Sequence, residues 1–265
     1  MRIQPHRSED RVVNIPLYSS AARLSRPSAE LVRAQYLYVG LSVLFALIAF
    51  LGFAPSYWVP LASGALDLHP TVHVHAALFF LWTLLFIAQT VLVTSGRRSW
   101  HRELGLAGIA LASAMVFSGI LATVVSLQAL LPVRPEFART GAALGFSSIA
   151  LFTSFVTLAI ANIRRPERHK RLMVLASFTI SQAAVVRLIR LVPSTELAGR
   201  VFLGAVAVDL LLLAVVLIDR RSTGRVHPVW LPGGAALVLV QYLRVAIVPT
   251  QFWRDVTQWL AMLGA

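Results

Sequence analysis

Residues 69–102 read HPTVHVHAALFFLWTLLFIAQTVLVTSGRRSWHR, an apolar run that ends in a basic turn. The run from Val72 to Thr94 holds no Asp, Glu, Lys or Arg. A helix needs about 20 apolar residues to cross a hydrocarbon core about 30 Å thick, and six other stretches have the same character. The pattern predicts an all-α bundle of seven membrane-spanning helices: Leu31–Phe53, Val72–Thr94, Leu104–Gln128, Arg139–Ile163, Leu172–Val192, Val201–Ile218 and Val229–Val248.

The composition also indicates a membrane protein. Of the 265 residues 57% are hydrophobic and only 13% are charged, whereas soluble domains carry about 25% charged residues. The chain has no cysteine, which excludes disulfides, thiolate metal sites, iron–sulfur clusters and catalytic cysteines. The net charge of +13 comes from bases in the short gaps between apolar runs, so it favours membrane topology over nucleic-acid binding.

Lys and Arg are concentrated on one side of the predicted bundle. Seventeen of the 24 lie in the N-terminal tail, at the entry to the first span, or in the connectors after spans two, four and six. Four lie on the opposite side and three lie inside spans. The positive-inside rule therefore predicts a cytoplasmic N-terminus and an outer C-terminus, in a bacterial inner membrane.

The chain is predicted to have three parts. Residues 1–30 are polar and contain Pro and Ser, and we expect a disordered cytosolic tail there. Residues 31–248 form the transmembrane domain, arranged as one helix followed by three hairpins. Residues 249–265 are expected to form an interfacial amphipathic helix on the outer surface. Its apolar stripe consists of Phe252, Val256, Trp259 and Leu263.

The three basic connectors have similar sequences: GRRSWHRELG (96–105), IRRPERHKRLM (163–173) and DRRSTGRVHP (219–228). Hairpin duplication explains the similarity, and so does independent accumulation of arginine in cytoplasmic turns. Each connector brings one histidine, His101, His169 or His227, to the start of a span. A helix N-terminus keeps imidazole neutral, and a neutral ring can bind haem iron or a metal ion. Equally, an amphipathic ring can lie at head-group level with no chemical role.

Further histidines lie at the outer entrance of the second span. Pro70 marks the first turn of that helix. His73 and His75 are separated by about 200° around a helix with 3.6 residues per turn. They therefore form only a weak metal-binding motif, and we expect His75 to face the bundle interior.

Several charged residues lie inside predicted spans, where charge is costly unless it is paired or faces a cavity. These are Arg187, Arg190, Asp209 and Arg244. In one interpretation Asp209 forms an ion pair with Arg187 or Arg190, which ties helices together or carries a proton. In the other, Arg187, Asp209, Arg244, His75 and Gln241 line an outward polar pocket for a small anionic ligand, a quinone carbonyl or a haem propionate.

The motifs HRELG (101–105) and HKRLM (169–173) resemble helix starts in families of uncharacterised bacterial multi-pass integral-membrane proteins. More distantly, histidines on several spans are similar to those of the transmembrane di-haem cytochromes b of the ferric reductase type. That resemblance implies a membrane oxidoreductase in which His101 and His169 bind one haem b. The chain departs from the pattern because spans four and six lack histidine and because both candidate ligands lie at helix ends.

Three functions are compatible with these features. The first is a redox protein that holds haem b or a metal ion through His101 and His169, near a quinone or another electron donor. The second is a transporter or binding protein for a small molecule, with Asp209 as a proton carrier. The third is an accessory subunit of a membrane complex. A retinal protein is excluded, because the single lysine, Lys170, lies in a connector.

Overall fold

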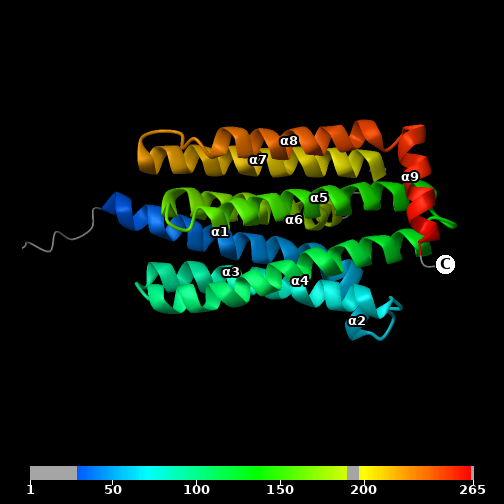
Figure 1. Ribbon diagram of the computed structural model, residues 1–265, viewed down its shortest axis with the longest axis horizontal. Coiled ribbons are helices and arrows are strands. Elements are labelled where there is room, and N and C mark those ends of the chain that lie inside the picture. The colour runs from blue at the N-terminus through cyan, green and yellow to red at the C-terminus, as the bar shows by residue number, and fades with distance from the viewer. Residues whose placement is uncertain (1–28, 190–196, 264–265) are drawn as a thin grey trace, which may run out of the picture.

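The computed structural model describes residues 29–189 and 197–263, and it confirms the predicted all-α bundle. Seven of its helices are long and apolar enough to cross a membrane, and they lie side by side (Figure 1). No strand occurs within the described ranges. The long helices are α1 Ala29–Phe53, α3 Pro70–Thr94, α4 Arg98–Leu130, α5 Pro135–Ala161, α6 Pro166–Ile189, α7 Leu197–Thr223 and α8 Trp230–Ile247.

Proline and glycine set several helix ends. Pro70, Pro135 and Pro166 are the first residues of α3, α5 and α6, where the missing N–H leaves no hydrogen bond unmade. Gly96 and Gly224 have φ of 77° and 75° just after α3 and α7, a conformation that glycine adopts without strain. The connectors after α3, α5 and α7 all lie at the end of the bundle where α1 begins, and we call this the basic end (Figure 1).

Some helices extend beyond their predicted bounds. Helix α4 begins at Arg98 rather than Leu104, and α7 continues to Thr223 rather than Ile218. These two predicted spans stop short of the basic connectors, but a helix can continue past the hydrocarbon while long basic side chains extend into water. Helix α1 is also prolonged, through a π-helical turn (Ala54–Trp58) and the short α2 (Val59–Ala62). Pro55 lies in that turn, where the wider helix accommodates its ring and its missing N–H.

Helix α6 is the centre of the bundle. In its apolar window 61% of the residues are buried, against 22–33% for the other six long helices. Figure 1 shows α1, α5 and α6 in the middle, with α3 and α4 on one side and α7 and α8 on the other. Leu175, Phe178 and Ala184 of α6 are almost inaccessible. Because α6 is enclosed by other helices, its polar side chains are positioned to interact with protein rather than with lipid.

Helix α9 (Gln251–Met262) lies across the ends of α4 and α5, opposite the basic end (Figure 1). Its inner face is fixed by Thr257, which is fully buried, and by Trp253, whose Nε1 donates to the carbonyl oxygen of Arg139 at 3.1 Å. Phe252 and Trp259 of the predicted apolar stripe point away from the bundle, with 68% and 58% of their surface exposed. That exposed apolar face is what an interfacial helix requires, and membrane contact there stays a prediction.

Candidate functional site

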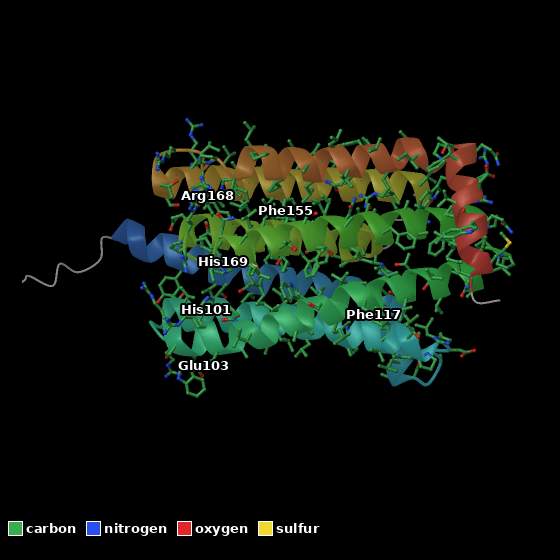
Figure 2. The ribbon with its side chains drawn as sticks, viewed as in Figure 1. His101, Glu103, Phe117, Phe155, Arg168 and His169 are labelled. Carbon is green, nitrogen blue, oxygen red and sulfur yellow. The ribbon has the colours of Figure 1, made fainter. Side chains whose placement is uncertain are left out.

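His101 and His169 come together at the basic end. Each is the fourth residue of its helix, because α4 begins at Arg98 and α6 at Pro166. Their ring centroids are 6.4 Å apart and their planes are nearly perpendicular, at 84° (Figure 2). The repeated connector sequence therefore places two rings in the same register of two helices, α4 and α6.

The surroundings of His169 fix its tautomer. Nδ1 of His169 lies 2.9 Å from the carbonyl oxygen of Ala159, in the last turn of α5. Since a carbonyl only accepts, Nδ1 must carry the proton, and Nε2 keeps a lone pair. The Ala159 carbonyl also accepts from the N–H of Asn162 at 3.1 Å, and its second lone pair is available to the ring.

The surroundings of His101 differ. The backbone of Gln89 in α3 lies near its ring. Nδ1 of His101 is buried and has no hydrogen-bond partner among the described residues. A buried ring nitrogen of this kind calls for an explanation such as a bound ion or ligand. In His169 one nitrogen is held by a backbone carbonyl and the other is available as a ligand, an arrangement typical of histidines that bind metals.

The third connector histidine does not join this pair. Nδ1 of His227 accepts from the backbone N–H of Val229 at 3.2 Å, which stabilises the turn before α8. Burial lowers the pKa of His227, and the nearby positive charge of Arg171 lowers it further. The similarity of the three connectors therefore does not extend to one shared site.

Near His227 lies a buried charge network that the sequence analysis missed. Arg171 and Asp219 have only 1% and 2% of their side chains exposed. The guanidinium of Arg171 donates two hydrogen bonds to the Asp219 carboxylate, from Nε at 2.9 Å and from Nη2 at 2.8 Å. Asp219 also accepts from Trp230 Nε1 at 2.7 Å and from the Tyr38 hydroxyl at 3.2 Å. The network joins α1, α6, α7 and α8, and its complete hydrogen bonding indicates a structural role.

A second polar cluster lies in the half of the bundle nearer α9, around Arg244 of α8. The Arg244 side chain is 7% exposed, and it donates to Gln182 Oε1 and to Ser147 Oγ at 3.1 Å. Both partners are neutral. Arg244 Nε, Gln182 Nε2 and Gln241 Oε1 are buried with no hydrogen-bond partner in the described ranges. Unsatisfied atoms of this kind call for an explanation such as a bound water, ion or ligand.

Asp209 of α7 accepts hydrogen bonds from two residues of α8. It accepts from Gln241 Nε2 at 2.8 Å and from the Tyr242 hydroxyl at 3.2 Å. Arg187 donates to the carbonyl of Ala183 at 2.8 Å, and its guanidinium lies 4.2 Å from the Phe53 ring centroid. Among residues 29–189 and 197–263, no salt bridge connects Asp209 to Arg187. Arg190, the other predicted partner, lies outside the described residues.

His73 and His75 have different neighbours. His73 Nδ1 lies 3.1 Å from the Tyr57 hydroxyl, in the π-helical turn. His75 is directed toward α4, where its Cε1 would be 3.5 Å from a Cβ at Gly119, and its Nδ1 is buried without a described partner. His69 accepts from the Thr71 N–H at 3.3 Å and so caps α3. In the described part of the chain no three His, Asp or Glu side chains gather as a metal site.

Comparison with protein-family models, with curated protein sequences and with solved structures finds no match to this chain.

Proposed function

We propose that the protein is a membrane-embedded electron-transfer protein, in which His101 and His169 would hold one haem b at the basic end. The observation that carries this proposal is the spacing of the two rings. An ion on the line between the two rings, bound to one nitrogen of each at about 2.0–2.1 Å, would separate the centroids by about 6 Å, since a ring nitrogen lies roughly 1 Å from the centroid. The spacing of 6.4 Å is close to that value.

The number of ligands favours haem over a bare ion. Structural zinc sites take four protein ligands and catalytic ones take three, whereas this pair has no third His, Asp or Glu within the described ranges. Haem iron takes four nitrogens from the porphyrin and needs only axial ligands from protein. Two facing histidines on separate helices meet that need.

The chain contributes orientation and a defined proton position. The Ala159 carbonyl holds the Nδ1 proton of His169, which directs the Nε2 lone pair to the site. Haem, when bound, supplies one-electron chemistry. Lying at the end predicted to face the cytoplasm, the pair is positioned to exchange electrons with a donor at the membrane surface.

The test is the absorbance of protein purified from cells supplied with a haem precursor, together with metal analysis of the same sample. We expect a Soret band and about one iron per chain, both lost in His101→Ala and in His169→Ala. His69→Ala, which removes a histidine that only caps α3, should keep both. A colourless and metal-free parent protein would refute the proposal. Stoichiometric zinc or copper without a Soret band would show that the histidine pair binds a bare metal ion and not haem.

Arg244 favours a second candidate, a protein that binds or transports a small molecule with an anionic or carbonyl group. A buried cation without a counter-ion is destabilising by several kcal/mol, and its partners Gln182 and Ser147 carry no charge. A carboxylate or a quinone carbonyl bound at Arg244 would satisfy its free Nε and offset that cost. In a transport cycle, Asp209 would be the group that carries a proton.

This candidate is tested by tryptophan fluorescence during titration with benzoate and, separately, with a water-soluble benzoquinone. We expect saturable binding of one of them, weakened at least tenfold in Arg244→Gln and unchanged in Arg134→Gln, which alters an exposed arginine elsewhere. Equal affinities in the two variants, or no saturable binding by the parent protein, would exclude this site for both classes of ligand.

A further inference from the structure

A groove of about 520 Å³ opens on the side of the bundle between α5, α6 and α8. Its walls are mainly apolar, and its floor includes Phe155 and Leu172, which are 4% and 7% exposed. Small residues, Gly233 and Ala236, line the α8 wall. A Cβ at Gly233 would lie 2.3 Å from Leu175 Cδ1, so glycine lets α8 approach α6 closely without moving that side chain. The small size of Gly233 and Ala236 keeps the groove open.

The polar residues of the groove are concentrated at the basic end, where Asn162 and the exposed Arg168 form its mouth. In Figure 2 Arg168 lies at that end and Phe155 lies further along the bundle. The neighbouring Glu167 carboxylate binds Lys170 and Arg171 instead. Within the described chain no carboxylate pairs with Arg168, so its charge is available to a ligand.

The dimensions match one leaflet of a bilayer. Along α5 the groove extends from Leu151 to Asn162, which is about 16 Å at roughly 1.5 Å per residue. Half of a hydrocarbon core about 30 Å thick is about 15 Å. An acyl chain of the leaflet at the basic end can therefore lie along the whole groove, with its head group level with Arg168.

We propose that this groove binds one anionic phospholipid of the leaflet at the basic end. One acyl chain lies on Phe155 and Leu172, and the head-group phosphate contacts the guanidinium of Arg168 and the amide of Asn162. Basic pockets between membrane helices on the cytoplasmic side suit anionic head groups for this reason. The inference does not depend on haem binding or on the Arg244 site.

The experiment is native mass spectrometry of the full chain from mixed micelles with equal amounts of phosphatidylglycerol and phosphatidylcholine. We expect one retained phosphatidylglycerol, preferred at least fivefold. Arg168→Gln should abolish that preference, and Ser154→Trp, which fills the groove from an exposed position, should remove the bound lipid. Arg102→Gln and Leu210→Trp change an exposed arginine and an exposed apolar residue outside the groove, and they should behave like the parent protein.

Equal retention of both lipids by the parent protein would overturn the proposal, as would a loss of preference of the same size in Arg102→Gln. If Ser154→Trp fails to fold, the comparison of Arg168→Gln with Arg102→Gln still shows whether the lipid preference depends on Arg168. If the parent protein retains no lipid but forms a dimer that Ser154→Trp breaks, the proposal is wrong and the groove binds a second copy of the chain instead.

Discussion

Removing the Asp219 carboxylate should be among the most destabilising single substitutions in this protein. Asp219→Ala leaves the Arg171 guanidinium, 1% exposed, with only the exposed Glu167 as a carboxylate partner. It also leaves Trp230 Nε1 and the Tyr38 hydroxyl without their acceptor. Removing one partner of a buried ion pair costs about 3–5 kcal/mol. At about 2–4 °C per kcal/mol for a chain of this size, the expected fall in Tm is about 6–20 °C.

The assay is thermal unfolding in detergent, followed by tryptophan fluorescence, with Asp255→Ala as the control at an exposed aspartate. A second variant separates charge from packing. Arg171→Met combined with Asp219→Leu removes both charges, and replacing a buried pair by apolar residues is often nearly neutral. We expect it to recover at least half of the lost Tm. Two results would refute a stabilising role of the buried ion pair. One is an Asp219→Ala variant that melts within about 2 °C of the parent protein, and the other is a double variant no more stable than Asp219→Ala.

Three further predictions concern separate regions. Gly52→Ala should lower the free energy of unfolding by about 1–3 kcal/mol, because the new Cβ would lie 2.5 Å from the carbonyl oxygen of Ala184. The control is Gly40→Ala, whose new Cβ would meet open space and should not destabilise the protein. Asp209→Ala should cost about 1–3 kcal/mol by leaving Gln241 Nε2 unpaired in a buried site, and Asp209→Asn, which keeps an acceptor, should cost less. Detergent melts check both, and equal Tm values within either pair would contradict the reasoning. Because the pKa of His227 is lowered on folding, the unfolded chain binds that proton more readily, so stability should fall as pH drops below about 6.5. Melts from pH 7.5 to 5.5 should show a weaker dependence in His227→Asn, and an unchanged dependence would count against this role.

The sequence predicts the elements of this fold well because lipid imposes a simple requirement on each span. Hydropathy located all seven helices, and Pro70 marked the start of α3 correctly. The lateral packing of the helices is harder to predict from the sequence, because hydropathy does not say which helices are neighbours. Asp219 is followed directly by Arg220 and Arg221 and so looks like part of a solvated turn, yet its partner is Arg171, 48 residues earlier.

In the candidate sites, too, the sequence predicted some of the residues but not their partners. The matching contexts of His101 and His169 singled out two residues that the structure brings together, and their role as ligands stays a prediction. For Asp209, opposite charge suggested Arg187 or Arg190 as a partner. The structure shows hydrogen bonds from Gln241 and Tyr242, and pairing with Arg190 stays a prediction because Arg190 lies outside the described residues. Gln182 and Ser147 gave no signal in the sequence, because neutral polar residues inside a span stand out only when their burial and partners are known.

The central place of α6 has a consequence for biosynthesis. Arg171 emerges from the ribosome 48 residues before Asp219, which at about 5–20 residues per second is an interval of about 2–10 s. During that interval the nascent chain must keep a guanidinium whose only other carboxylate partner in the described part of the chain is Glu167 either at the lipid–water boundary or within the insertion machinery. Helix α6 can reach its final place only when the last hairpin arrives, so a chain truncated before α7 should be cleared by membrane quality control.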